Sequence, residues 1–286
     1  MDESRAKTLV SCSISFTFLS LLFMLLRFCC KVRYGRKFEW ADYILAFSWV
    51  LLLASAGLTI AATRYQFGEH NEYVSQADRE MTTILIAVEE SLNAICIGFA
   101  QTSVALSVLR FTSKPWEKAL IWFIILSVQF TKWLSSIFVF TACTPITRRA
   151  DPTIPGECWD LDTLATFSAF TSGWSGAMNF VVVIISWYLI WRTQMRIEEK
   201  IGLVVVFGLG IISTVAAAIK TCSLVSAILS PDASWSMARM VLWMLLEAAV
   251  IIMAASIPYL RLMLKEASRS VARSLTVGDQ APHSVE

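Results

Sequence analysis

The sequence predicts an all-α integral membrane protein: a bundle of seven transmembrane helices, with the N-terminus outside and the C-terminus in the cytosol. Three observations indicate this fold class. Of 286 residues, 56% are hydrophobic and 16% are charged, whereas soluble domains carry about 25% charged residues. Seven apolar segments follow one another along the chain, and Lys and Arg concentrate in alternate connections. This composition excludes a soluble domain and predicts one membrane domain.

A transmembrane helix needs about 20 predominantly apolar residues. The segments of that kind are 8–26, 41–62, 81–109, 119–142, 166–190, 201–229 and 239–260. They place the seven-transmembrane domain in residues 1–265 and leave 266–286 as a short disordered cytosolic tail. The first segment has Arg5 and Lys7 before it, as a secretory signal would, but it ends in LLRFCCKVRYGRK without a small-residue cleavage site. We therefore interpret it as a retained span.

The orientation follows from the distribution of Lys and Arg. The first, third and fifth connections and the tail hold 15 of them, the other side holds 7, and Lys132 and Lys220 fall inside spans. Arg27 and Lys31 count here as residues of the first connection. Because basic loops stay in the cytosol, the tail is expected there. The protein is expected to be a multi-pass protein of the plasma membrane or an internal membrane.

Two cysteines bracket the fourth connection, CTPITRRADPTIPGEC, on the predicted outer side. A disulfide between Cys143 and Cys158 would persist in that oxidising environment. The alternative is two free thiols at the ends of spans. No Cys or His spacing typical of a zinc site occurs, so no metal is expected.

Several polar side chains fall inside the predicted spans. A helix rises about 1.5 Å per residue, so Glu90 lies about 30 Å from Arg110, which is the full thickness of the hydrocarbon layer. Lys132 and Glu247 lie about 21 Å from the basic side, and Lys220 about 30 Å. Because adjacent helical residues point about 100° apart, only one of Glu89 and Glu90 is expected to face the bundle axis. The other is expected to reach the headgroup region.

Charged groups inside a bilayer face the bundle interior or water and are functional candidates. The candidates for ligand binding are Glu89, Glu90, Gln101, Lys132, Asn179, Lys220 and Glu247. One interpretation is a polar pocket that opens to the outside. The other is a set of structural ion pairs, such as Lys220 with Glu247 and Lys132 with Glu90. The residues alone leave both open.

Five segments resemble motifs of the fungal rhodopsin-domain family. They are EWADYILAFSW (39–49), AATRYQFGEH (61–70), SVALSVLRF (103–111), LIWRTQMRIEEKIGLVVVFGLG (189–210) and LWMLLEAAVIIMAASIPYLR (242–261). They occur in the family's order over roughly residues 35 to 265, and the ACTP and GEC of the fourth connection also match. The resemblance implies a fungal seven-helix membrane protein. Some relatives look like G-protein-coupled receptors, and others are encoded beside secondary-metabolite pathways.

The family pattern also falls on individual positions of this chain: Asp42, Tyr43, Glu90, Arg110, Cys143, Cys158, Trp191, Gln194, Trp243, Glu247 and Pro258. The chain departs from it at two places. Gln101 stands where a lysine is expected in the third span, and Asn179 stands where an acid is expected in the fifth. The ligand or partner is therefore expected to differ from those of relatives.

No cofactor and no retinal are expected, despite the family's name. A retinal Schiff base needs a lysine amine within the last helix, and the last predicted span contains no lysine. Lys265 lies beyond its end, and Lys132 and Lys220 lie on other spans.

Two functions remain open. The first is a receptor-like protein that senses or handles a small lipophilic molecule, linked to secondary metabolism, with a cytosolic signalling partner on its basic face. The alternative is a membrane-embedded, cofactor-free enzyme, such as an acid-catalysed cyclase, in which Glu90 and Glu247 would donate protons. A transporter is less favoured because inverted repeats are lacking. The expected surroundings are the lipid bilayer, with no nucleic acid partner.

Overall fold

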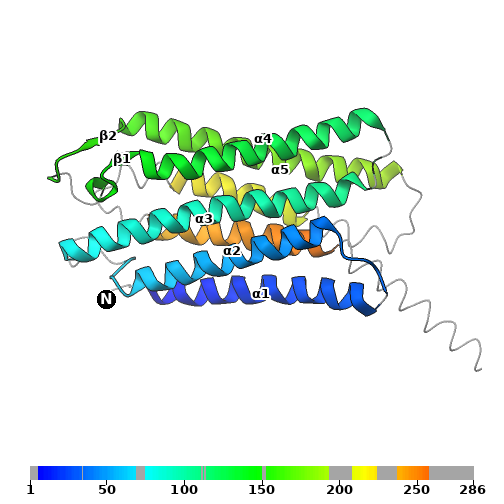
Figure 1. Cartoon of the computed structure of the whole chain (residues 1–286), viewed down its shortest axis with the longest axis horizontal. Helices are drawn as coiled ribbons and strands as arrows, with labels where there is room; N and C mark the ends of the chain where they lie inside the picture. Colours follow the sequence, from blue (N-terminus) through cyan, green and yellow to red (C-terminus); the bar gives the residue numbers. More distant parts are fainter. Residues whose placement is uncertain are drawn as a thin grey trace, which may run out of the picture.

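The computed structural model describes residues 6–33, 35–68, 75–110, 112, 114–149, 153–192, 208–223 and 237–257. These residues form long helices that lie alongside one another (Figure 1). The helices are α1 (Ala6–Arg33), α2 (Trp40–Thr63), α3 (Gln76–Leu109), α4 (Pro115–Thr141), α5 (Leu161–Arg192), Gly208–Ser223 and Met237–Ile257. Six of them are long and apolar enough to cross a membrane, and Gly208–Ser223 is a shorter apolar helix.

The described helices overlap the predicted spans but differ from them at several ends. The first helix was expected to end at residue 26, but α1 continues to Arg33. The predicted span 201–229 is described only over 208–223, and the predicted tail 266–286 lies outside the described residues.

A short loop connects α4 to α5. It contains β1 (Cys143–Thr144), the 3₁₀ helix η2 (Ile146–Arg149) and β2 (Glu157–Cys158). The two strands pair antiparallel, with Cys143 opposite Cys158. We call the end of the bundle that carries this loop the loop end (left in Figure 1). The opposite end, where Arg27, Lys31 and Arg110 lie, is the basic end.

Local sequence determines where several helices begin. Glu39 caps α2 in a reciprocal capping box with Asp42, which satisfies backbone N–H groups that the first turn leaves free. The Ser75 hydroxyl accepts a hydrogen bond from the Asp78 amide at 3.3 Å and caps α3. Pro115 occupies the first turn of α4, where its missing N–H costs nothing.

The centre of the bundle is formed by α3 and the Met237–Ile257 helix. In their most apolar stretches, 61% of the residues of α3 and 78% of those of Met237–Ile257 are buried, compared with 28% for α1. Polar contacts join α3 to α2: the Asn93 amide donates to the Ser55 hydroxyl at 3.3 Å, and the Ser103 hydroxyl donates to the Ala41 carbonyl at 2.7 Å. Such contacts hold helices together in a membrane, because lipid provides no hydrophobic driving force for the association of helices.

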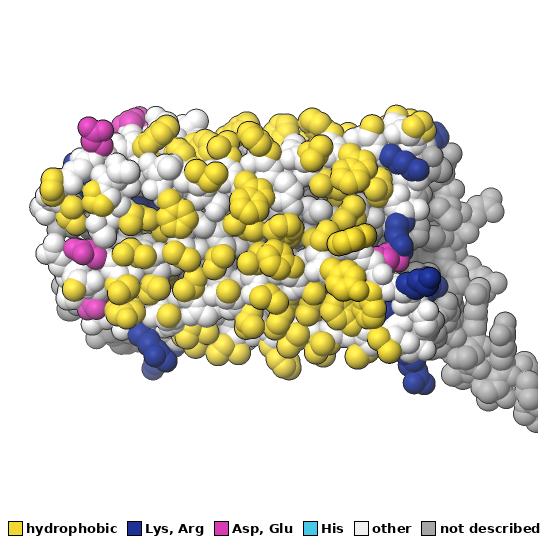
Figure 2. Space-filling view, viewed as in Figure 1, with side chains coloured by type: hydrophobic (Ala, Val, Ile, Leu, Met, Phe, Trp, Pro, Cys, Tyr) yellow, Lys and Arg dark blue, Asp and Glu magenta, His cyan; other side chains and the backbone are white. Residues whose placement is uncertain are grey.

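The face of the bundle drawn in Figure 2 is mostly apolar between its two ends. Large side chains such as Phe130 and Leu126 of α4 are about two-thirds exposed, which suits contact with lipid rather than water. Exposed aromatic residues near the basic end, Trp40, Tyr43 and Trp116, are typical of a membrane interface.

Candidate functional site

Charged and apolar side chains share a cavity at the loop end, bounded by α3, α4, α5 and the last two described helices. Its volume is about 90 Å³, which is room for several water-sized groups. The lining residues are Glu90, Ala94, Ile97, Lys132, Ser135, Phe138, Val139, Ala142, Arg149, Leu164, Ser168, Thr171, Ser172, Lys220, Met240 and Met244. We call this space the loop-end cavity.

Lys220 forms one side of the loop-end cavity. Its ammonium donates a hydrogen bond of 2.6 Å to Glu247, and both side chains are buried. The ion pair links the Gly208–Ser223 helix to the Met237–Ile257 helix. This is one of the two pairs that the sequence suggested.

Glu90 contacts a different partner from the one expected. Its carboxylate lies 3.6 Å from the guanidinium of Arg149 in η2, so the suggested pair between Glu90 and Lys132 was wrong. Arg149 lies within the loop that a disulfide between Cys143 and Cys158 closes. Sequence reasoning missed Arg149 because its position depends on how the loop folds back over α3, which no local pattern indicates.

Lys132 extends into the loop-end cavity from α4 and is buried. Its ammonium makes no hydrogen bond or ion pair with any described residue. The lysine can lie close to α3 because Gly98 has no side chain. A Cβ at position 98 would be 3.3 Å from Cγ of Lys132 and 3.1 Å from Oε1 of Gln129.

Glu89 is fully buried, and neither of its carboxylate oxygens has a hydrogen-bond partner among the described residues. Glu90 is also buried. The expectation that one of these two acids reaches the headgroup region was therefore wrong. The reason is that α3 is surrounded by other helices at this level, so both of its faces there point into protein.

Two further candidates lie away from the loop-end cavity. Gln101 and Asn179 line a separate void of about 10 Å³ between α3, α4 and α5, which is too small for more than one water. The amide of Asn179 donates to the Ser213 hydroxyl at 3.2 Å, and Gln101 contacts Ser175 at 3.4 Å. These two amides therefore join helices to one another.

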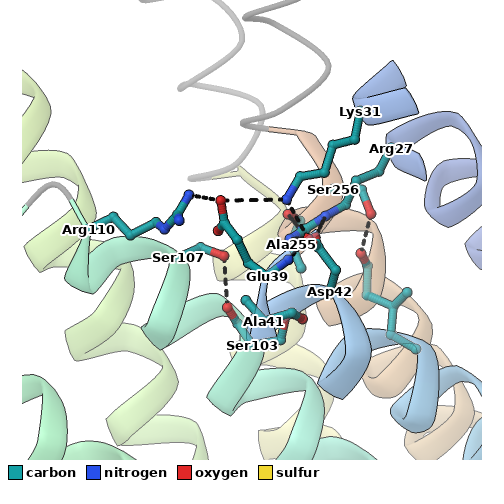
Figure 3. A network of polar contacts seen from close by, with 11 residues as sticks. Arg27, Lys31, Glu39, Ala41, Asp42, Ser103, Ser107, Arg110, Ala255 and Ser256 are labelled. Atoms are coloured by element: carbon teal, nitrogen blue, oxygen red, sulfur yellow. Dashed lines mark hydrogen bonds and ion pairs between the residues drawn. The ribbon is translucent and has the colours of Figure 1, made fainter. Parts of the chain in front are cut away.

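A second polar cluster, at the basic end, was not predicted (Figure 3). Asp42 accepts hydrogen bonds from Nη2 of Arg27 at 2.6 Å and from Nε at 2.9 Å, and it also pairs with Lys31. Nη1 of Arg27 donates to the Ala255 carbonyl at 2.6 Å. The cluster thus joins α1, α2 and the Met237–Ile257 helix, and Arg27, Lys31 and Asp42 are all buried.

Glu39 extends this cluster toward α3. Its carboxylate pairs with Arg110 and lies 4.0 Å from Lys31 (Figure 3). From the sequence, Arg27 and Lys31 were expected to be loop residues. Their spacing of four, with an acid early in the next helix, was the signal that both lie on one buried face.

No group of three or more His, Cys, Asp or Glu residues within the described ranges could hold a metal ion. Of the positions on which the family pattern falls, Gln194 and Pro258 lie outside the described residues, as does the side chain of Trp191.

Comparison with known families gives a match to the fungal rhodopsin domain over residues 26–266. The chain belongs to the fungal rhodopsin-domain family. The predicted all-α, multi-pass membrane protein is confirmed by this match together with the six apolar helices.

Two curated relatives from this comparison are fungal. The chain is 27% identical over 154 residues to the fugralins biosynthesis cluster protein 2 of Gibberella zeae, covering 52% of this chain and 38% of that protein. It is 23% identical over 266 residues to the wortmanamides biosynthesis cluster protein C of Talaromyces wortmannii, covering 90% of this chain and 70% of that protein. Thus the chain spans well under half the length of the first relative. Both names link this fungal rhodopsin-domain protein to relatives from biosynthesis clusters.

Proposed function

We propose that this fungal rhodopsin-domain protein binds a small lipophilic molecule in the loop-end cavity and senses it for a secondary-metabolite pathway. The observation that carries the proposal is the cavity itself, in which Glu90, Lys132 and Lys220 come from three different helices. The relatives from biosynthesis clusters support the link to secondary metabolism. The excess of basic residues at the other end supports an orientation with the loop end outside.

The Met237–Ile257 helix offers a physical route from the cavity to the basic end. Met240 and Met244 line the cavity, and Glu247 holds Lys220. Further along the same helix, the Ala255 carbonyl accepts the hydrogen bond from Arg27. A ligand that displaces this helix would therefore also disturb the basic-end cluster, where a cytosolic signalling partner would bind. Small helix shifts of this kind are a common means of transmitting ligand binding.

One observation favours a second candidate function, a cofactor-free enzyme. The Glu90 oxygen Oε1 is buried without a hydrogen-bond partner among the described residues, and the residue lines the cavity. A carboxyl group placed in this way could give a proton to a bound substrate. Glu247 is less suited to that role than the sequence suggested, because Lys220 holds its carboxylate.

The experiment compares three strains of the fungal host. In one the gene is deleted, and in the other two it encodes the Glu90→Gln or the Leu126→Ile variant. Leu126 is exposed on the outside of α4, away from the loop-end cavity, so Leu126→Ile is the matched control. Metabolites and the transcripts of the neighbouring biosynthetic genes are measured together, and protein abundance is checked with an epitope tag.

For a sensor, the deletion lowers the pathway transcripts and all pathway products together. For an enzyme, one intermediate accumulates while transcripts stay unchanged, and Glu90→Gln reproduces that accumulation at normal protein abundance. If the deletion changes neither metabolites nor transcripts, both functions are refuted.

A further inference from the structure

Two of the three cations that line the loop-end cavity have a carboxylate partner, and the third has none among the described residues. Lys220 is neutralised by Glu247 at 2.6 Å, and Arg149 pairs with Glu90 at 3.6 Å. Lys132 is the third cation on the wall and has no carboxylate partner among the described residues. Glu89 is not among the residues that line the cavity. Among the described residues, Lys132 is therefore the cation of the cavity wall that no carboxylate contacts directly.

An isolated charge inside a membrane protein is costly unless something neutralises it. A ligand with a negative group would do so, because the ammonium can donate up to three hydrogen bonds. Charge-assisted hydrogen bonds of this type are shorter and stronger than those between neutral groups.

The other side chains that line the cavity indicate which chemical groups the ligand has besides its negative charge. Ile97, Phe138 and Met244 provide apolar surface. On α5, Ser168 and Thr171 provide hydroxyls that can contact a second polar group. Apolar walls with a few polar groups are the usual composition of small-molecule sites.

We propose that the loop-end cavity selects small amphipathic carboxylic acids, whose carboxylate binds the Lys132 ammonium and whose hydrocarbon part packs against Ile97, Phe138 and Met244. This inference deepens the proposed function, on which it rests, by assigning the chemical class of the ligand. Lys132 is the residue that recognises the charge, and Lys220 remains bound to Glu247.

The test uses the full chain in nanodiscs of zwitterionic lipid at neutral pH, with labelled octanoate and octanol as probes. Binding to empty nanodiscs is subtracted. The variants are Lys132→Met, Lys132→Arg and Lys118→Met. Lys118 is exposed on the same helix, so Lys118→Met removes a charge of the same kind away from the cavity.

We expect saturable octanoate binding to the unaltered protein, about tenfold or more weaker in Lys132→Met. Lys118→Met should bind octanoate as the unaltered protein does, and Lys132→Arg should retain part of the binding. Octanol should bind more weakly than octanoate, with no loss in Lys132→Met. If Lys132→Met fails to fold, the comparison of octanoate with octanol on the unaltered protein decides.

Three results would overturn the proposal. In the first, octanol and octanoate bind equally well and Lys132→Met changes neither affinity. The cavity would then be a lipophilic site that does not select carboxylates. If chloride stabilises the unaltered protein through Lys132 and octanoate adds nothing, the cavity is an inorganic anion site. Absence of saturable binding by either probe would contradict both this inference and the proposed function.

Discussion

Lys220 and Glu247 are joined by a hydrogen bond of 2.6 Å between the last two described helices. Removing one partner leaves the other charge buried, which costs about 3–5 kcal/mol in buried pairs. We therefore expect Glu247→Gln and Lys220→Met each to destabilise the protein strongly, as measured by reversible unfolding in mixed micelles.

The double variant Lys220→Met with Glu247→Leu provides the control for this prediction. Because it leaves no charge behind, we expect it to recover most of the stability that either single variant loses. If the losses of the single variants simply add, the pair contributes no coupling and the prediction is wrong.

In the basic-end cluster, the buried carboxylate of Asp42 should contribute much more to stability than the exposed ion pair of Arg110 with Glu39. Asp42 is buried between Arg27 and Lys31, so Asp42→Asn should cost about 3–5 kcal/mol. Arg110 is 51% exposed in its pair with Glu39, so Arg110→Ala should change stability by at most about 1 kcal/mol. The free energies of unfolding of the two variants are measured in the same mixed micelles. Equal losses of stability would show that burial does not determine how much each ion pair of this cluster contributes.

The sequence predicted most of the helices because an apolar run of sufficient length is itself the physical requirement for crossing a membrane. It also placed Glu90, Lys132 and Lys220 at compatible depths, since helical rise is constant. These three residues do line one cavity. Depth does not tell which way a side chain points, which is why Gln101 and Asn179 were grouped with them although they line a separate void.

The errors have a common physical origin. Arg27 and Lys31 follow an apolar run and look like loop residues, but α1 continues and Asp42 compensates their charge. Likewise, Lys132 was given Glu90 as a partner, whereas Arg149 of η2 takes that place. In both cases the ion pair joins elements whose relative position depends on tertiary packing. The spacing of Arg27 and Lys31 indicates a shared helix face, but the contact with Asp42 depends on how α1 packs against α2.

Gly98 is required where α3 and α4 approach each other. An added Cβ would be 3.1 Å from Oε1 of Gln129 and 3.3 Å from Cγ of Lys132, so Gly98→Ala should cost about 1–3 kcal/mol. It should also weaken octanoate binding, because the stem of Lys132 must move. Gly173 on α5 has open space around it, and Gly173→Ala should be neutral or gain about 0.5–1 kcal/mol. Unfolding and octanoate binding of both variants test this, and a harmless Gly98→Ala would contradict it.

The disulfide should stabilise the loop end. Cys143 and Cys158 are separated by 15 residues, and closing a loop of that size contributes about 3 kcal/mol in the chain-entropy model. The paired variant Cys143→Ser with Cys158→Ser should therefore lower the Tm, and a reductant should lower the Tm of the unaltered protein but not of this variant. Cys29→Ser is the control because Cys29 is exposed and unpaired.

The disulfide should also govern the contact between Arg149 and Glu90, because Arg149 lies inside the loop that it closes. With the disulfide intact, Arg149→Ala should cost about 1 kcal/mol, as expected for a partly exposed ion pair. In the variant without Cys143 and Cys158, the loop no longer holds Arg149 over the cavity, and the same substitution should cost less. A double-mutant cycle of the four proteins measures this coupling. If Arg149→Ala costs the same in both backgrounds, η2 holds Arg149 without help from the disulfide, and the loop would cover the cavity independently of redox conditions.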